Sequence, residues 1–236
     1  MTKMNRSPLH NIYDKIVCIS LREREDKYKF MSDRLINHGI EVEWYHPVIN
    51  GFNRAIVESL SQTKRGHFNL DNPNEFGCAM SHYHVIKTAL LEGVQNLFVF
   101  EDDAVFHKDF DELLPKYLDK IPENTDGILL YSFMYDILSQ NVRLNSRWTK
   151  AHKSWSLIAY GISRKVMEEY IKRQDAFFTI SDIVTYKMQE EGFNFVVASP
   201  PLVVPNKELT SNIRTVKNYE TTKSILLLGI NENNYV

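Results

Sequence analysis

The chain has 236 residues, which is enough for one large domain with a substantial core or for two small ones. Its 43% hydrophobic and 25% charged residues are ordinary for a folded globular protein. A formal net charge of −2 argues against a protein that binds mainly nucleic-acid backbone, because that task demands a basic surface. We therefore expect no nucleic-acid partner.

The amino-terminal stretch MTKMNRSPLHNIYDK lacks the apolar core of a signal peptide. No run approaches the roughly 18 apolar residues of a membrane helix. We expect a cytoplasmic protein, and the sequence leaves peripheral attachment to a membrane open. Cys18 and Cys78 stand in apolar surroundings without metal-ligand spacing, which predicts buried, reduced thiols. The oligomeric state is not predicted.

The first segments alternate between strand-like and helix-like patterns. Lys15–Leu21 is predicted to be a buried strand. A helix is expected over Glu25–Gly39, because apolar residues recur at helical spacing and a glycine ends the pattern. A short strand over Glu41–Val48 and an irregular polar stretch through Asn74 follow.

The remaining segments continue this alternation. A long helix is predicted over Glu75–Gly93, and Leu97–Phe100 is typical of a strand covered on both faces because it does not alternate. The other predicted strands are 127–132, 156–163 and 194–199, and the other predicted helices are 164–173 and 182–192. The pattern favours an α/β fold with a largely parallel central sheet.

Three consecutive acids, Glu101, Asp102 and Asp103, end the most hydrophobic strand. Side chains alternate across a strand, so Glu101 and Asp103 are expected to point one way and Asp102 the other. No Lys or Arg is adjacent, and the nearest in sequence are Lys87 and Lys108. Two convergent carboxylates at the carboxyl end of such a strand favour Mg²⁺ or Mn²⁺. The alternative is a solvated loop or a helix amino terminus.

A metal site is favoured over a solvated loop by the surrounding segment, NEFGCAMSHYHVIKTALLEGVQNLFVFEDDAVF. This segment resembles the signature block of glycosyltransferase family 25, the lipooligosaccharide and collagen glycosyltransferase family. In that block Gly-Cys-x-x-Ser-His on a helix precedes a hydrophobic strand that ends in Glu-Asp-Asp. The matching residues are Gly77, Cys78, Ser81, His82, Glu101, Asp102 and Asp103.

Further segments resemble the family in the same order. CISLREREDK resembles its first strand, Ile-Asn-Leu-x-x-Arg, with Ser20 at the usual Asn. VING resembles an Ala-Val-Asp-Gly turn, and TISDIVTYKM places Asp182 on a family Asp. The resemblance covers residues 14–213, so we expect one domain there, an extension over 1–13 and a tail over 214–236.

The resemblance implies a GT-A type, Rossmann-like domain that transfers a sugar from a nucleotide donor to an acceptor hydroxyl of a glycan or protein. Similar enzymes use UDP-galactose or UDP-glucose with Mn²⁺ and invert the anomeric centre. Mg²⁺ is the alternative metal. A metal held by carboxylates neutralises the charge of the departing diphosphate. Asp103 is expected to bind the metal directly, with Glu101 at the metal or ribose and Asp102 in either role or holding a loop.

The resemblance also suggests roles for other residues. Asp182 is expected to be the base for the attacking hydroxyl, and the alternative is an acid that stabilises a first helical turn. His82, beside Ser81, is expected either to contact the donor or to be a satisfied interior histidine. Ser20, Leu21 and Arg24 are expected at the uracil and phosphates, with Arg22 and Lys27 as alternatives.

Two other functions compete with glycosyl transfer. A catalytically inactive relative that acts as a binding or adhesion module is the main alternative, although the acids at 101–103 and 182 are intact. A nucleotidyltransferase is less favoured, because CISLREREDK has no glycine for a phosphate-binding loop.

Overall fold

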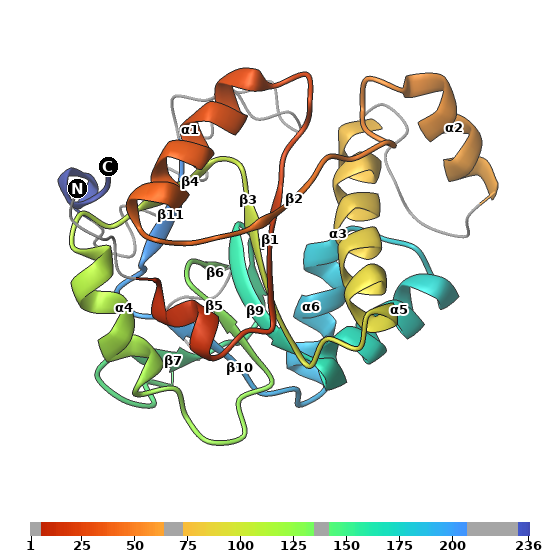
Figure 1. Ribbon diagram of the computed structural model, residues 1–236. Coiled ribbons are helices and arrows are strands. Elements are labelled where there is room, and N and C mark those ends of the chain that lie inside the picture. The colour runs from red at the N-terminus through yellow and green to blue at the C-terminus, as the bar shows by residue number, and fades with distance from the viewer. Residues whose placement is uncertain (1–5, 64–72, 135–141, 207–230) are drawn as a thin grey trace.

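The computed structural model describes residues 6–63, 73–134, 142–206 and 231–236 (Figure 1). A seven-stranded sheet with the order β2–β1–β3–β9–β5–β10–β7 lies at its centre. Its strands are Lys15–Ile19 (β1), Glu43–Tyr45 (β2), Asn96–Glu101 (β3), Gly127–Leu129 (β5), Trp148–Lys150 (β7), Ala159–Ser163 (β9) and Phe195–Ala198 (β10).

The sheet is mostly parallel. Strand β1 pairs in parallel with β2 and β3, and β10 pairs in parallel with β5. Strand β9 runs antiparallel between β3 and β5, and β7 runs antiparallel to β10. Strands β1, β2, β3, β5 and β10 therefore share one direction, which confirms the predicted sheet.

Helices cover both faces of the sheet (Figure 1). Helices α1 (Glu25–Asn37) and α4 (Phe110–Leu118) contribute to the core on one face. Helices α3 (Pro73–Leu91), α5 (Arg164–Ala176) and α6 (Ser181–Glu190) contribute to the core on the other. The predicted α/β fold is thereby confirmed.

Strand β3 lies between these two layers. Leu97 and Val99 pack in the core beside α3, and Phe98 and Phe100 pack in the core beside α1. All four side chains are fully buried, as the unbroken apolar run predicts. Each such burial contributes roughly 1.5–3 kcal/mol, so β3 is a firm base for the acids that follow it.

Several elements differ from the predicted pattern. Helix α2 (Arg54–Thr63) lies in the stretch expected to be irregular, and its Val57 is buried against the core. Helix α4 was not predicted. Short elements are specified by partners in space rather than by periodicity, and the pattern therefore missed them. These are the pairs β4 (Ala104–Phe106) with β11 (Val203–Pro205) and β6 (Phe133–Met134) with β8 (Ser154–Trp155), and the 3₁₀ turns Pro8–Asn11 and Glu232–Asn234.

Both described chain ends contact the domain. Leu9 and Tyr13, before the predicted boundary at residue 14, are buried in the core beside α1. The hydroxyl of Tyr235 donates a hydrogen bond to the carbonyl of Pro201 at 2.8 Å. The limits 14–213 remain a prediction, because most of the tail lies outside the described residues. Within the described ranges, no helix combines the length and apolarity needed to cross a bilayer.

Candidate active site

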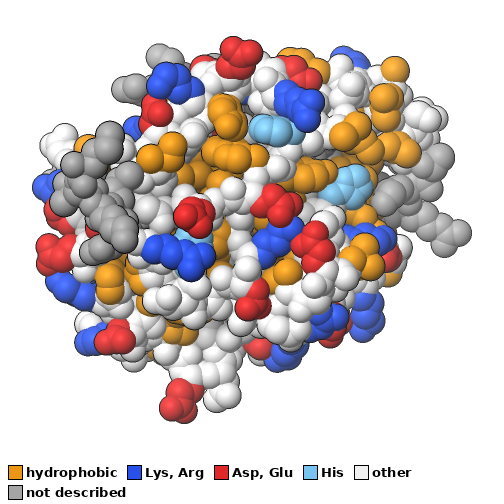
Figure 2. Space-filling model, in the orientation of Figure 1, with side chains coloured by type: hydrophobic (Ala, Val, Ile, Leu, Met, Phe, Trp, Pro, Cys, Tyr) orange, Lys and Arg blue, Asp and Glu red, His pale blue; other side chains and the backbone are white. Residues whose placement is uncertain are grey.

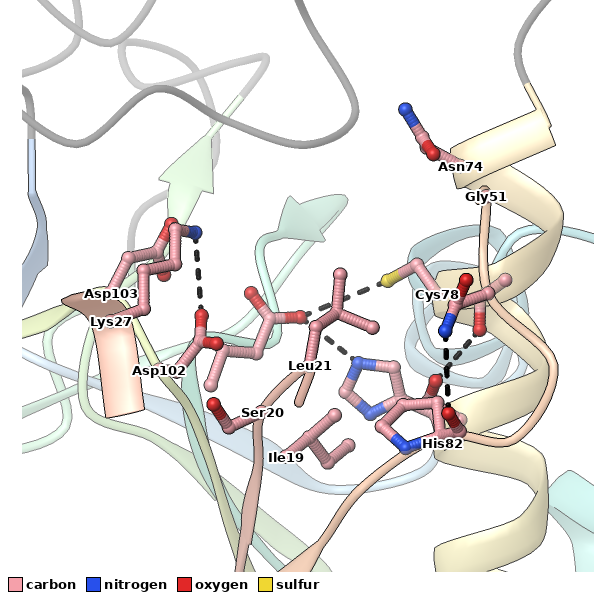
Figure 3. Close-up of a pocket in the computed structure, with 15 residues that line it drawn as sticks. Ile19, Ser20, Leu21, Lys27, Gly51, Asn74, Cys78, His82, Asp102 and Asp103 are labelled. Carbon is pink, nitrogen blue, oxygen red and sulfur yellow. Dashed lines mark hydrogen bonds and ion pairs between the residues drawn. The ribbon is translucent and has the colours of Figure 1, made fainter. Parts of the chain in front are cut away.

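A cleft opens where β1 and β3 end, and α3 forms one of its walls (Figure 3). It has about 660 Å³ of unfilled space, part of it open to solvent. The predicted site residues that line it are Ser20, Leu21, Ser81, His82, Glu101, Asp102 and Asp103.

The sheet register brings the cleft residues together. Ile19 at the end of β1 pairs with Glu101 at the end of β3, so Ser20 lies beside the acids. The loop around Asn50 closes against α3. A Cβ atom on Gly77 would lie 3.0 Å from the Cα of Asn50, so the absence of a side chain at this glycine permits the close approach.

A buried lysine compensates two of the acids. The ammonium of Lys27, on α1, lies 3.3 Å from Asp102 Oδ1 and 3.5 Å from Asp103 Oδ2. Burial favours the neutral amine, but the attraction of Asp103 and Asp102 outweighs it and raises the pKa of Lys27. The cation that pairs with these acids is therefore not adjacent in sequence, because the helix after β1 supplies it across the sheet edge.

The side chain of Glu101 points away from the group formed by Lys27, Asp102 and Asp103. Its Oε1 accepts a hydrogen bond from His82 Nε2 at 3.0 Å and lies 3.9 Å from Cys78 Sγ. The expected alternation, with Glu101 and Asp103 together and Asp102 apart, was wrong. Strand β3 ends at Glu101 and the next two residues form a turn, so Asp102 and Asp103 both reach Lys27.

The three acids have different proton affinities. Burial, with repulsion from Glu101 and Asp102, raises the pKa of Asp103 to about 6. Burial also raises the pKa of Asp102. For Glu101 burial acts in the same direction, but the hydrogen bond and charge of His82 overcome it and lower the pKa.

Asp103 has one oxygen without a partner. Its Oδ1 is buried and makes no hydrogen bond with any of the described residues. Burial of a carboxylate oxygen without a hydrogen bond lowers the stability of the fold, because the hydration lost on folding is not replaced. Such an oxygen is suited to receive a cation or a hydrogen-bond donor of a ligand.

His82 is fully buried and both its ring nitrogens have partners. Nδ1 lies 2.9 Å from the hydroxyl of Tyr160 on β9, and Nε2 faces Glu101. These contacts fit the alternative of a satisfied interior histidine, while the ring also lines the cleft. Ser81 lines the cleft too, but its hydroxyl donates to the carbonyl of Gly77 at 2.7 Å.

Two predicted residues do not line the cleft. Arg24 precedes α1 and binds Asp26 through two hydrogen bonds of 2.7 and 2.8 Å. Asp182 is the second residue of α6 and is half-buried. Its charge nevertheless contributes to the raised pKa of Cys78, after burial and Glu101, so it lies near the same region.

The sequence pattern predicted a buried thiol at Cys78, whereas the structure places this residue, only partly buried, in the cleft beside Glu101. The expectation that both cysteines lack metal-ligand geometry was wrong for this residue. Cys78, His82 and Glu101 offer ligand atoms that all lie within 4.8 Å of one another. The i, i+4 spacing of Cys78 and His82 on a predicted helix was the available signal. The expectation of reduced thiols is confirmed, since both cysteines are free.

The surface around α1, β2 and α2 is partly apolar. Hydrophobic side chains gather in the upper half of the face in Figure 2, where these elements lie in Figure 1. Val48 and Phe52 are 82% and 63% exposed, and the cleft-lining residues Pro47, Asn50 and Gly51 lie in the same segment. Lys, Arg, Asp and Glu side chains are otherwise interspersed on this face.

Residues 13–193 match the family model described as glycosyltransferase family 25 (LPS biosynthesis protein). The chain belongs to glycosyltransferase family 25. The family that the sequence motifs suggested is thereby confirmed, and the protein is a glycosyltransferase whose class implies a nucleotide-sugar donor and a glycan acceptor.

Two solved structures show a distant likeness to this glycosyltransferase. A glycosyltransferase involved in the glycosylation of the major capsid of PBCV-1 is 8% identical, with 90% of this chain and 98% of that chain covered and a TM-score of 0.47. The inositol-1-phosphate CTP transferase from T. maritima is 10% identical, with 89% and 96% covered and a TM-score of 0.40. Both TM-scores are below 0.5, which marks the likeness as distant.

Proposed function

We propose that this family 25 enzyme transfers a hexose, galactose or glucose, from a UDP-sugar to an acceptor hydroxyl with inversion, and that it requires Mn²⁺ or Mg²⁺. The observation that carries the proposal is the group of three acids at the end of β3, which line one cleft together. One acid there has a buried oxygen with no partner among the described residues.

The donor atoms fit a hard divalent cation. Carboxylate oxygens are the ligands that Mg²⁺ and Mn²⁺ prefer. Asp103 and Glu101 would hold the cation, since Asp103 offers its unpartnered Oδ1 and the two acids are close enough for Glu101 to raise the pKa of Asp103. When bound, the cation supplies positive charge opposite the diphosphate that leaves.

The charge of the cleft supports the same conclusion. At neutral pH three ionised acids give −3 and Lys27 gives +1, so the group carries −2. A divalent cation balances that charge, whereas the diphosphate alone would be repelled. Lys27 holds Asp102 and Oδ2 of Asp103, so it fixes the acids in place before a donor arrives.

The end of β1 is the proposed position of the nucleoside. Ser20 and Leu21 follow β1 and line the cleft beside the acids. Arg24 would have to exchange its contact with Asp26 to reach a phosphate. His82 and Ser81 form the wall on the α3 side, where the donor sugar is proposed to lie.

We assign the base to Asp182. In the proposed step the acceptor oxygen attacks the anomeric carbon, the bond to the diphosphate oxygen breaks, and the hydroxyl proton passes to the Asp182 carboxylate. The influence of Asp182 on the pKa values of Cys78 and Tyr160 supports its nearness to the α3 wall.

A glycan acceptor is favoured over a protein by the family description, which names LPS biosynthesis. We therefore place the reaction in the cytoplasm, with peripheral membrane attachment as a further proposal.

A panel of UDP-sugars tests this function. UDP release is measured with Mn²⁺, with Mg²⁺ and with a chelator, for the parent, for Asp103→Asn and for Asp33→Asn. Asp33 is a matched control on α1, where it pairs with the exposed Lys29. We expect metal-dependent release that Asp103→Asn lowers by roughly 10²-fold or more and that Asp33→Asn leaves unchanged.

Two outcomes contradict the proposal in different ways. Release of UDP without any divalent metal, or full activity of Asp103→Asn, removes the assigned metal role. Tight binding of a UDP-sugar without release or transfer, for any acceptor glycan offered, supports the alternative of an inactive binding module.

A further inference from the structure

We propose that Cys78, His82 and Glu101 form a second cation site, which binds a thiophilic divalent metal of the Zn²⁺ class. The three residues offer a sulfur, an imidazole nitrogen and a carboxylate oxygen, all within 4.8 Å of one another. Glu101 would be shared with the proposed donor cation, since its Oε1 faces Cys78 and His82 and its Oε2 is left for the ion at Asp103. The inference does not rest on the proposed glycosyl transfer, because it concerns only what these three side chains bind.

The backbone already brings the three ligand atoms together. Cys78 and His82 are one helical turn apart on α3, so they share a face of the helix. Glu101 Oε1 lies 3.0 Å from His82 Nε2 and 3.9 Å from Cys78 Sγ. Ligand atoms around a tetrahedral zinc ion are roughly 3.3–3.6 Å apart by the usual Zn–N, Zn–O and Zn–S lengths. Small side-chain movements therefore suffice to admit the ion.

The surrounding contacts orient the imidazole for this role. The hydroxyl of Tyr160 lies 2.9 Å from His82 Nδ1, which leaves Nε2 directed at Glu101. Tyr160 and His82 are each only 1% exposed, so neither ring can turn easily. A partner on the far ring nitrogen is the usual arrangement for a metal-binding histidine.

The chemistry of the three donors selects the metal. A thiolate with an imidazole favours Zn²⁺, whereas Mg²⁺ and Mn²⁺ prefer oxygen ligands. Three protein ligands leave a fourth position, and all three residues line the cleft. Coordination replaces the proton of the Cys78 thiol, which passes to solvent.

The competing explanation is a hydrogen-bonded group that binds no metal. His82 donating to Glu101, with the thiol nearby, satisfies the three side chains without an ion. Spectroscopy of bound Co²⁺ separates the two, because only a cobalt–thiolate bond gives an intense near-ultraviolet charge-transfer band.

The test is a Co²⁺ titration of the metal-free, full-length chain. We expect a charge-transfer band and strong visible bands of a four-coordinate ion, both removed by equimolar Zn²⁺. Cys78→Ser is expected to lose the near-ultraviolet band. Cys18→Ser, the matched control at the other free thiol, is expected to keep it. Tyr160→Phe is expected to keep the band but weaken Co²⁺ binding about 10- to 100-fold.

Two further measurements separate this site from the proposed donor metal. Asp103→Asn is expected to keep the Co²⁺ bands although it loses metal-dependent UDP release. In the parent, Zn²⁺ is expected to slow alkylation of Cys78 and leave that of Cys18 unchanged, which tests the site even if Cys78→Ser does not fold. The inference is overturned if the folded parent gives no charge-transfer band, if the band persists in Cys78→Ser, or if Asp103→Asn abolishes it.

Discussion

The ammonium of Lys27 lies 3.3 Å from Asp102 Oδ1, and the two residues are 3% and 7% exposed. This buried pair connects α1 to the turn that follows β3. It also holds the acidic group together, because the same ammonium contacts Asp103.

Replacement of Lys27 by Met should destabilise the fold strongly. It leaves Asp102 and Asp103 buried without their cation, and loss of one partner of a buried ion pair typically costs about 3–5 kcal/mol. The free energy of unfolding in urea measures the effect. Lys29→Met is the control, since Lys29 is exposed on the same helix and its pair with Asp33 contributes about 0.5 kcal/mol or less. Equal effects of the two variants would contradict the structural role of Lys27.

Gly77→Ala should lower the stability of the fold, although alanine favours a helix more than glycine does. Its Cβ would lie 3.0 Å from the Cα of Asn50 and 3.1 Å from the amide of Gly51, so the loop must move. Helix propensity alone predicts that the substitution raises stability by about 1 kcal/mol. A loss of stability in thermal unfolding would therefore report the contact between residue 77 and the loop. A more stable variant with unchanged UDP affinity would show that the loop does not pack as described.

The framework of the fold was predictable because it rests on local patterns. The apolar run Leu97–Phe100 and the helical spacing of residues 75–93 identified β3 and α3 within a few residues. Helix α2 and the short strands were missed, because their formation depends on neighbours such as the core that Val57 enters.

The cleft was predictable in part. The order of the motifs identified most of its lining, including Ser20, His82 and the acids of residues 101–103. The orientation of the acids was not predictable, because it depends on where β3 ends and on Lys27 across the sheet edge. The contact between Tyr160 and His82 was not predictable either, since a contact between a strand and a helix distant in sequence leaves no spacing pattern.

The stability of the metal-free protein should fall as pH rises through about 6. Asp103 has a raised pKa of about 6 in the folded chain, against 3.8 for an ordinary Asp side chain. The folded state thus binds the extra proton, so this stability is fully present below about pH 4 and is lost as pH rises through about 6. Asp102 acts in the same direction because its pKa is raised, while the lowered pKa of Glu101 acts in the opposite one.

The Asp103→Asn variant isolates the contribution of the Asp103 carboxyl group to the pH dependence of stability. Urea unfolding of the metal-free chains from about pH 4 to 7 should show the parent losing on the order of 2–3 kcal/mol more than the variant. Parallel stability profiles for the two chains would mean that Asp103 titrates normally in the folded state.

Asp182→Asn should separate donor binding from chemistry. Loss of a general base lowers turnover by about 10²–10⁴-fold, whereas the affinity for the UDP-sugar should change by no more than about threefold. Single-turnover transfer and equilibrium binding give the two quantities. If donor binding is lost together with transfer, Asp182 belongs to the donor site and not to the base role.

Calorimetry of UDP binding to the parent and to Asp103→Asn, with and without Mn²⁺, measures whether Asp103 holds a metal that the donor requires. We expect that the parent binds UDP tightly only when Mn²⁺ is present and that Asp103→Asn loses this dependence together with most of its affinity. Equal UDP affinity of the parent with and without Mn²⁺, or full Mn²⁺-dependent affinity in Asp103→Asn, would contradict it.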